Sequence, residues 1–398
     1  MSGGRDHVAQ KEWAVYVAVA LAAAAAVALH PAKAIDYQVY FDNTHHYFAG
    51  AAMYGPASGT GWAGGVYRYP PLFLDLFRGL AWLPLAWGAA LWAAGKVLAL
   101  GALLTHLRRR WGLKSSAAFW PGLILIAPYF VQEVRYGNAQ FYIVALCIVG
   151  LLHLRASAAV GLAAALKVWP LLFLPCLFFA RRWRALAWAA ASVVGLTLLP
   201  ALWRGPGAQM ALLGQWLTQE RAIGKLNEIW YPGQSLHDVL LRYLTVVDYS
   251  RLPDTAYRQV AWLHWSPIGV ERLWWVLVVL LMAGFFYALV RGGYGDGAVA
   301  AMFCAMVIVE PHVHRLILES LLLPALWIAS LRGARPRWFW FAMVVSAIEP
   351  LVPGGGRQRV MQVYGVDFWL VVLPLTWVVC VAWLRCLPDM TERAELAH

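Results

Sequence analysis

Charged residues are scarce in this chain: they make up 13% of its 398 residues, whereas 62% of the residues are hydrophobic. Soluble domains average about a quarter charged residues and about half apolar ones. The shortage of charge therefore excludes an ordinary soluble protein, and the sequence contains no low-complexity segment or solenoid repeat that would indicate another class. We predict an all-α polytopic membrane protein.

Cysteine is also sparse. None of the five cysteines belongs to a Cys-x-x-Cys pair, and all five lie in or at the ends of apolar runs. These positions indicate neither a disulfide framework nor a thiolate metal site. The adjacent residues His45 and His46 do not suggest a metal site either, because neighbouring side chains diverge by roughly 100° on a helix. We expect no metal and no cofactor.

Positive charge, by contrast, is in excess, and the formal net charge is +12 at pH 7. The basic residues form short clusters between apolar runs and do not follow one helix face or a tail, so nucleic acid is not an expected partner. Clusters of this kind set membrane topology and attract anionic lipids. The 23 tryptophans fit the same environment, because indole favours the membrane interface.

Apolar runs of membrane length or slightly less recur along the chain. They extend over Trp13 to Leu29, Leu85 to Leu107, Ala117 to Val131, Ala139 to Leu154, Ala158 to Ala180, Ala185 to Leu202, Leu273 to Val290, Gly297 to Val309, Leu316 to Leu331, Trp338 to Val352 and Phe368 to Leu384. The first run is long enough to span, and the segment from His30 to Lys33 is a poor signal-peptide cleavage site. We therefore expect a retained helix there.

Three basic clusters orient these runs, because such clusters favour the cytoplasmic side. They are Arg108 to Lys114, Arg181 to Arg184 and Arg332 to Arg337. All three can be cytoplasmic only if the run from Ala158 to Ala180 does not cross the membrane. Pro170 breaks a helix in that run, and Lys167 at mid-depth must face protein or water. We predict a re-entrant pair of half-helices there, in a bundle of about ten full crossings with both termini in the cytoplasm.

The chain, residues 1–398, is then a single membrane domain with two long extracytoplasmic loops, 33–84 and 203–272. The first loop contains YRYPPLFLDLF (Tyr67 to Phe77), in which paired prolines precede apolar residues, and this pattern predicts an interfacial helix. The second contains YPGQSLHDVLLRYL (Tyr231 to Leu244), which predicts an amphipathic loop helix.

Under this topology, the strongly polar residues outside the basic clusters gather on the extracytoplasmic side. Acids, bases and cations that converge on one side are typical of an active site. Asp36 lies about one turn past the first helix, low enough to be partly desolvated and to act as a general base. A capping or interfacial aspartate is the alternative. His312 and His314, in EPHVH, are the other catalytic candidates, and their spacing of two lets only one face a cavity on a helix.

Arg135 and Lys167 are the candidate cations for a substrate phosphate. Arg135 precedes a helix whose N-terminal dipole also favours anions, and the break around Lys167 argues that this side chain lines a site. A lysine or arginine that extends to the membrane interface is the alternative for each. The remaining candidates for substrate binding are Asp42, His45, His46, Tyr69, Asn138, Gln140 and Gln234.

An ordered series of short motifs resembles the polyprenyl-phosphate-mannose-dependent mannosyltransferases of glycosyltransferase family 87, in the GT-C superfamily of membrane glycosyltransferases. The series is Asp36 with Tyr40, YRYPPLFLDLF, RYGNAQ (135–140), GLAAALKVWPLLFLP (161–175) followed by RRWR, GQSL (233–236) and EPHVH (310–314). The resemblance covers residues 33–200 well and the remainder loosely. The chain departs from the family at Gly137-Asn138-Ala139-Gln140, where glycine-glutamine-x-asparagine is usual.

The resemblance implies a GT-C-like helix bundle and a single displacement at the extracytoplasmic face of the inner or plasma membrane. Asp36 would take the proton from an acceptor hydroxyl as that hydroxyl attacks the anomeric carbon of a lipid-phosphate-linked sugar, most simply mannose. Arg135 and Lys167 would hold the departing phosphate without a metal. The implied partners are a polyprenyl-phosphate sugar donor, a lipid or glycan acceptor and membrane lipids.

Two other classes of function remain open at this stage. A lipid or sugar transporter or flippase would also use intramembrane charge and broken helices, although no second copy of the Lys167 break occurs in the C-terminal half. A noncatalytic assembly subunit would not require polar residues to converge on one face.

Overall fold

The computed structural model describes residues 3–55, 67–223, 233–246, 259–331, 337–348 and 363–386. Within these ranges the chain is helical and contains no strand, so the predicted all-α class is confirmed. Six described helices are long and apolar enough to cross a membrane: Lys11–Leu29, Leu85–Arg110, Ser116–Tyr136, Trp183–Arg204, Pro267–Gly292 and Phe368–Arg385. Four shorter apolar helices cover Gln140–Leu152, Trp169–Phe179, Asp296–Val309 and Ile317–Ser330. The protein is a multi-pass membrane protein.

Two compact units make up the chain. The first unit comprises Met1–Ala117, Phe130–Leu171 and Arg184–Lys225, and the second comprises Ala118–Tyr129, Leu172–Trp183 and Leu226–His398. The boundary passes through α5 (Trp120–Tyr136), next to Pro128 inside that helix.

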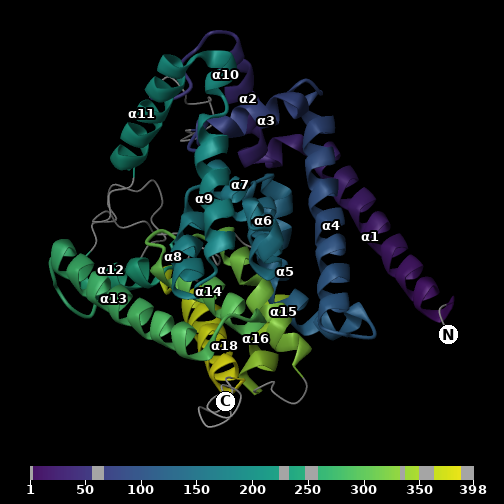
Figure 1. Cartoon of the computed structure of the whole chain (residues 1–398), viewed down its shortest axis with the longest axis vertical. Coiled ribbons are helices and arrows are strands. Elements are labelled where there is room, and N and C mark those ends of the chain that lie inside the picture. Colours follow the sequence, from purple (N-terminus) through teal and green to yellow (C-terminus); the bar gives the residue numbers. More distant parts are fainter. Residues whose placement is uncertain are drawn as a thin grey trace. The chain divides into compact units, whose positions relative to one another are not determined.

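The first unit contains the N-terminal helices and the predicted first loop. Its helices are α1 (Gly3–Leu29), α2 (Ile35–Phe48), α3 (Pro71–Ala81), α4 (Leu85–Arg110), α6 (Gln140–Leu152), α7 (Ala158–Leu166), α9 (Trp183–Leu198), α10 (Ala201–Arg204) and α11 (Pro206–Ile223). Helices α1 and α4 lie side by side (Figure 1). Helix α2 packs on α3, and α6 packs on α7.

Helix α3 confirms the helix predicted in the first loop. It begins at Pro71, because the missing N–H of proline is harmless at the first helical position. Its buried side chains, Phe73 and Phe77 among them, pack against Tyr40 of α2, with ring centroids 4.8 and 5.6 Å apart. Asp75, on the same helix, forms an ion pair of 2.6 Å with Arg204 of α10. The polar stretch after α1 therefore belongs to a helical pair with an aromatic core.

The predicted break at Lys167 is also confirmed. Helix α7 ends at Leu166, Lys167 adopts extended backbone (φ −154°, ψ 134°), and a 3₁₀ turn over Trp169–Leu172 follows. Helix α8 (Phe173–Phe179) begins immediately after that turn.

Helix α5 is longer than the apolar pattern predicted. The apolar run ends at Val131, but α5 continues to Tyr136. The helix extends beyond the apolar run because Glu133 is buried and ion-paired with Lys96 of α4. A charged residue that interrupts an apolar run therefore does not end the helix when its partner is also buried.

The second unit contains the remaining helices. They are α8, α12 (Leu236–Leu244), α13 (Pro267–Gly292), α14 (Asp296–Val309), α15 (Leu322–Ser330), α16 (Arg337–Ile348) and α18 (Leu373–Arg385). Residues 298–308 of α14 are all buried, and this helix packs against α13, α15 and α18. It forms the core of the unit.

Helix α12 confirms the loop helix predicted between Tyr231 and Leu244. It begins after Ser235, whose hydroxyl oxygen accepts a hydrogen bond from the backbone N–H of Asp238 and so caps the helix. Several predicted features lie outside the described residues: Tyr231 and Pro232, most of the basic cluster at 332–337, and parts of the 33–84 and 203–272 loops.

Candidate functional site

Asp36 lies in the first turn of α2 and is half-buried. Its carboxylate Oδ2 accepts a hydrogen bond of 2.9 Å from the side-chain amide Nδ2 of Asn138. Burial raises the pKa of Asp36, while the Asn138 hydrogen bond and the positive charge of Lys167 oppose that rise. Among the described residues, Oδ1 of this carboxylate makes no hydrogen bond. Asp36 therefore has a free oxygen with enhanced basicity.

The turn between α5 and α6 fixes the position of Asn138. Gly137 has φ of 75°, which glycine adopts readily, and a Cβ atom there would lie 2.5 Å from Cβ of Tyr37. Oδ1 of Asn138 accepts a 2.9 Å hydrogen bond from the backbone N–H of Gln140. The indole N–H of Trp92 donates to the Gly137 carbonyl at 2.9 Å. The turn thus holds the amide of Asn138 against the start of α2.

Two buried tyrosines extend this hydrogen-bond network. The hydroxyl of Tyr69 donates to Oδ1 of Asn138 at 3.3 Å, and the hydroxyl of Tyr40 donates to that of Tyr69 at 2.8 Å. Burial raises the pKa of both tyrosines above the ordinary value. They are therefore neutral donors at physiological pH, and they hold Asn138 without adding charge beside Asp36.

Lys167 brings a positive charge to the same place. Its Nζ donates a hydrogen bond of 2.8 Å to Oε1 of Gln140, which also accepts one of 3.3 Å from the indole N–H of Trp169. The same Nζ lies 5.6 Å from the centroid of the Tyr69 ring, within the range of a cation–π contact. We call Asp36, Tyr69, Asn138, Gln140 and Lys167 the Asp36 cluster.

A buried ion pair, which the sequence pattern did not reveal, supports this cluster. Lys96 of α4 and Glu133 of α5 are fully buried and contact each other directly. Nζ of Lys96 also donates to the Glu133 backbone carbonyl at 3.0 Å, and Oε1 of Glu133 accepts from the backbone N–H of Phe141 at 3.0 Å. The pair links α4, α5 and the start of α6, the three segments around the Asn138 turn.

These contacts limit which groups at the start of α6 are available to a phosphate. The N-terminus of α6 was expected to contribute its dipole to an anion site next to Arg135. Its first two amides, those of Gln140 and Phe141, already donate to the side chains of Asn138 and Glu133. The cation that the structure places within the Asp36 cluster is Lys167.

The other candidates of the first unit lie apart from the cluster. Arg135 is exposed near the end of α5, and His45 and His46 are exposed on α2, where Nδ1 of His45 is 2.9 Å from the Phe41 carbonyl oxygen. Asp42 is half-buried, and burial raises its pKa against the opposing effect of these histidines. Among the described residues, no hydrogen bond, ion pair or ring contact joins any of these four side chains to the Asp36 cluster.

In the second unit, two motifs that lie far apart in the sequence pack directly on each other. The backbone N–H of Gln234 donates to the Val313 carbonyl at 2.5 Å. The hydroxyl of Ser235 reaches the Pro311 carbonyl at 2.6 Å and the Asp238 carboxylate at 2.8 Å. The segments GQSL and EPHVH therefore form one structural element.

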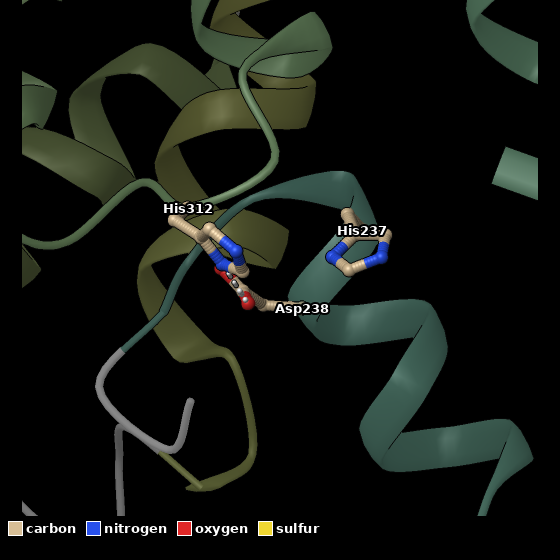
Figure 2. Close-up of side chains that lie close together, drawn as sticks. All are labelled: His237, Asp238 and His312. Atoms are coloured by element: carbon tan, nitrogen blue, oxygen red, sulfur yellow. Dashed lines mark hydrogen bonds and ion pairs between the residues drawn. The ribbon is translucent and has the colours of Figure 1, made fainter. Parts of the chain in front are cut away.

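His312 and His314 separate in this element. Nδ1 of His312 lies 3.4 Å from Oδ1 of Asp238, and its ring centroid lies 5.7 Å from that of His237. Figure 2 shows these three side chains, two from α12 and one from the EPHVH segment. We call them the His237 cluster; His314 is not a member. Sequence reasoning missed His237 and Asp238, although Ser-x-x-Asp is a helix-capping pattern that places Asp238 in the first turn.

The Asp36 cluster has the chemical groups for a displacement reaction. A desolvated carboxylate with a free oxygen can accept the proton of a hydroxyl nucleophile. A nearby ammonium group can stabilise negative charge that develops on a leaving group. Both groups form hydrogen bonds with side chains at the α5–α6 turn, Asp36 with Asn138 and Lys167 with Gln140, which favours a fixed geometry.

A family model described as Glycosyltransferase family 87 matches residues 67–318, more than half of the chain. The chain belongs to glycosyltransferase family 87. The match to family 87 includes the whole His237 cluster and every member of the Asp36 cluster except Asp36 itself.

A curated relative supports the same assignment to family 87. This chain is 30% identical over 231 residues to the polyprenol-phosphate-mannose-dependent alpha-(1-2)-phosphatidylinositol pentamannoside mannosyltransferase of Mycolicibacterium smegmatis. The alignment covers 54% of this chain and 55% of the relative, so the chain spans about half the length of that protein. No solved structure matches this family 87 chain.

Asn138 and Gln140, whose order is the reverse of the usual family 87 pattern, each have a partner that suits the length of the side chain. The shorter side chain, Asn138, reaches Asp36 across the turn, and the longer one, Gln140, reaches Lys167 and Trp169. The order of the two amides therefore determines which of them holds the carboxylate and which holds the ammonium group.

Proposed function

We propose that this protein transfers a mannosyl group from a polyprenyl-phosphate-linked donor to a hydroxyl of a lipid-linked or glycan acceptor. Membership of family 87 supports a glycosyltransferase. The name of the curated relative supports a polyprenol-phosphate-mannose donor and a lipid-linked acceptor. The observation that carries the proposal is the Asp36 cluster, in which a half-buried carboxylate with a free oxygen lies near Lys167.

In the proposed reaction, the acceptor oxygen attacks the anomeric carbon as the bond from that carbon to the phosphate oxygen breaks. The polyprenyl phosphate leaves with the bonding electron pair, and the hydroxyl proton passes to Oδ1 of Asp36. Asn138 supports this step because its hydrogen bond to Oδ2 orients the carboxylate. A single displacement of this kind inverts the anomeric configuration.

Lys167 would hold the departing phosphate. An ammonium group has three N–H donors, and charge-assisted hydrogen bonds to phosphate are about twice as strong as neutral ones. The step then needs no divalent metal at the Asp36 cluster. Arg135 would contact the donor from its exposed position. Asp42, His45, His46 and Gln234 are proposed substrate contacts, and one of His312 and His314 is proposed as a second catalytic residue.

The proposed reaction takes place on the extracytoplasmic side of the inner or plasma membrane. The basic clusters support a bundle with about ten full crossings and cytoplasmic termini. The break at Lys167 supports a re-entrant pair formed by α7 and α8, because irregular backbone is tolerated at membrane depth where it lines a cavity.

The test is transfer by Asp36→Asn in purified protein incubated with radiolabelled polyprenyl-phosphate mannose and a membrane extract. Asparagine preserves size and polarity but cannot accept the proton, so donor binding should persist while turnover falls by roughly 10²- to 10⁴-fold. Asp42→Asn is the matched comparison on the same helix and should lower turnover much less, because Asp42 is not the proposed base. Near wild-type turnover in Asp36→Asn would refute Asp36 as the base.

A further inference from the structure

We propose that His237, Asp238 and His312 bind a divalent transition-metal ion, with Zn²⁺ as the best-matched species. Each residue supplies a ligand atom of a type that Zn²⁺ accepts, namely imidazole nitrogen or carboxylate oxygen. These atoms all lie within 4.8 Å of one another. The sequence did not predict this site, because His312 and Asp238 are 74 residues apart.

The distance between His312 and Asp238 suits two ligands of one ion better than a hydrogen bond. Nδ1 and Oδ1 are 3.4 Å apart, whereas N–H···O hydrogen bonds in proteins span about 2.7–3.2 Å. Two atoms bound tetrahedrally at about 2.1 Å from Zn²⁺ lie about 3.4 Å from each other. An ion between them would satisfy both atoms without moving either segment.

The environment of His237 gives an independent reason. Its side chain is fully buried, and neither ring nitrogen makes a hydrogen bond of ordinary geometry among the described residues, although the backbone carbonyl of Pro311 lies close enough to raise the pKa of the ring. The ring of Trp274 packs edge-on against the His237 ring, with ring centroids 5.0 Å apart. Buried polar atoms are nearly always paired, with protein, water or an ion.

The residues around the His237 cluster are arranged as they are around the ligands of known metal sites. Ser235 donates to the Asp238 carboxylate at 2.8 Å, and outer hydrogen bonds of this kind orient metal ligands. The side chain of His312 is 28% exposed while that of Asp238 is fully buried. The His237 cluster is therefore buried on the side of Asp238 and accessible to solvent on the side of His312. Three protein ligands with an accessible fourth position are typical of zinc sites that bind water or an oxygen of a substrate.

A bound ion would connect helix α12 to the segment 310–314 of the same unit. Backbone and side-chain hydrogen bonds already join these segments at Gln234 and Ser235. Metal ligation would fix the orientation of the His312 ring, because a coordinated imidazole cannot rotate freely. Metal binding does not depend on Asp36 as the base, because the ligands lie outside the Asp36 cluster.

The experiment measures metal binding by the full chain in detergent, purified with a tag that contains no histidine. After treatment with a chelator, the protein is titrated with Zn²⁺ and, separately, with Co²⁺, whose absorption spectrum reports tetrahedral nitrogen and oxygen ligands. We expect about one ion per chain and a rise in Tm on addition of Zn²⁺. Mg²⁺ should not substitute, because it prefers octahedral oxygen ligation.

Three variants, His237→Gln, Asp238→Asn and His312→Gln, should each weaken Zn²⁺ binding by at least about ten-fold, as loss of one of three ligands implies. His314→Gln, in the same segment as His312, and Asp36→Asn should bind Zn²⁺ like the wild-type chain. Gel filtration shows whether each variant is folded. The proposal is overturned if the wild-type chain takes up no ion at micromolar Zn²⁺, or if folded His237→Gln binds it unchanged. Loss of transfer in Asp36→Asn with intact metal binding keeps the two proposals separate.

Discussion

At the scale of single residues, Asp36 combines burial, which raises its pKa, with three influences that lower it: the Asn138 hydrogen bond and the charges of Lys167 and Lys96. Burial and these three influences act in opposite directions on the same carboxylate. The proton affinity of Asp36 therefore depends on neighbours from three separate segments of the chain, α4, the α5–α6 turn and the break after α7.

Replacement of Asn138 should change the pH dependence of transfer. Asn138→Ala removes a hydrogen bond that lowers the pKa of Asp36, so burial acts with less opposition and the pKa rises further. Because the base must be ionised, the acidic limb of the kcat/KM profile should move to higher pH. Tyr69→Phe removes a contact to Asn138 but none to Asp36, so its profile should shift less. A profile unchanged in Asn138→Ala would contradict the role of Asp36.

Replacement of Lys167 should weaken use of the donor. Lys167→Met removes the ammonium group but keeps a side chain of similar length, and a hydrogen bond to a charged group is worth about 1.5–3 kcal/mol. We expect kcat/KM for the polyprenyl-phosphate donor to fall by roughly 10- to 100-fold, which corresponds to that energy. Arg135→Met, at an exposed position, should lower it less. If Lys167→Met and Arg135→Met lowered kcat/KM equally, Lys167 would not be the main phosphate ligand.

At the scale of elements, the α5–α6 turn determines how α2 meets the rest of the first unit. Its glycine is required twice over, by the positive φ at Gly137 and by the close approach of Tyr37. The carboxyl group of Glu133 and the side chain of Asn138 occupy the first amides of α6. The turn thus fixes the positions of Asn138 and Gln140. A displacement of the turn would separate Asn138 from Asp36.

Gly137→Ala tests that arrangement. A Cβ atom would lie 2.5 Å from Tyr37, so α2 or the turn must move, and we expect a lower kcat together with a lower Tm. Gly112→Ala is the control, because Gly112 also has a positive φ, 62°, but a Cβ there meets no atom within 4 Å. It should cost only the backbone strain, roughly 1 kcal/mol, and leave kcat unchanged. Equal losses of activity in both variants would rule out a specific role for the Tyr37 contact.

At the scale of the whole molecule, the membrane-spanning helices and the basic clusters determine which loops share a compartment. The chain has six described helices long enough to span, and four shorter apolar helices. The proposed topology places the loop 181–184 in the cytoplasm and the loop 203–272, which contains α11, outside. Its decisive element is the interruption at Lys167, because a full crossing there would reverse every later loop.

Cysteine labelling in intact cells tests this topology. In a background with the five native cysteines replaced by alanine, Arg182→Cys should be protected from a membrane-impermeant maleimide, whereas Leu217→Cys, exposed on α11, should react. Both sites should react after the membrane is permeabilised. Labelling of Arg182→Cys in intact cells would eliminate the re-entrant pair and require a full crossing between residues 158 and 180.

Much of the fold can be predicted from the sequence alone: the all-α membrane class, the positions of most apolar helices, the loop helices α3 and α12, and the break at Lys167. These features depend on local properties: the length of an apolar run, the backbone limits of proline and the cost of a charge within an apolar segment. The sequence also named Asp36, Asn138, Gln140 and Lys167 as candidates, because polar residues next to membrane-length apolar runs are conspicuous.

Contacts between these polar residues could not be predicted from the sequence and are known from the packed fold. It paired Asn138 with Asp36 and Gln140 with Lys167, left Arg135 exposed, and revealed Lys96 with Glu133 inside segments that the apolar pattern described as a span and a loop. The fold also brings together His237, Asp238 and His312, which belong to two motifs far apart in the sequence. The physical reason is that a buried polar group needs a partner, and packing between helices, which no local pattern encodes, supplies that partner.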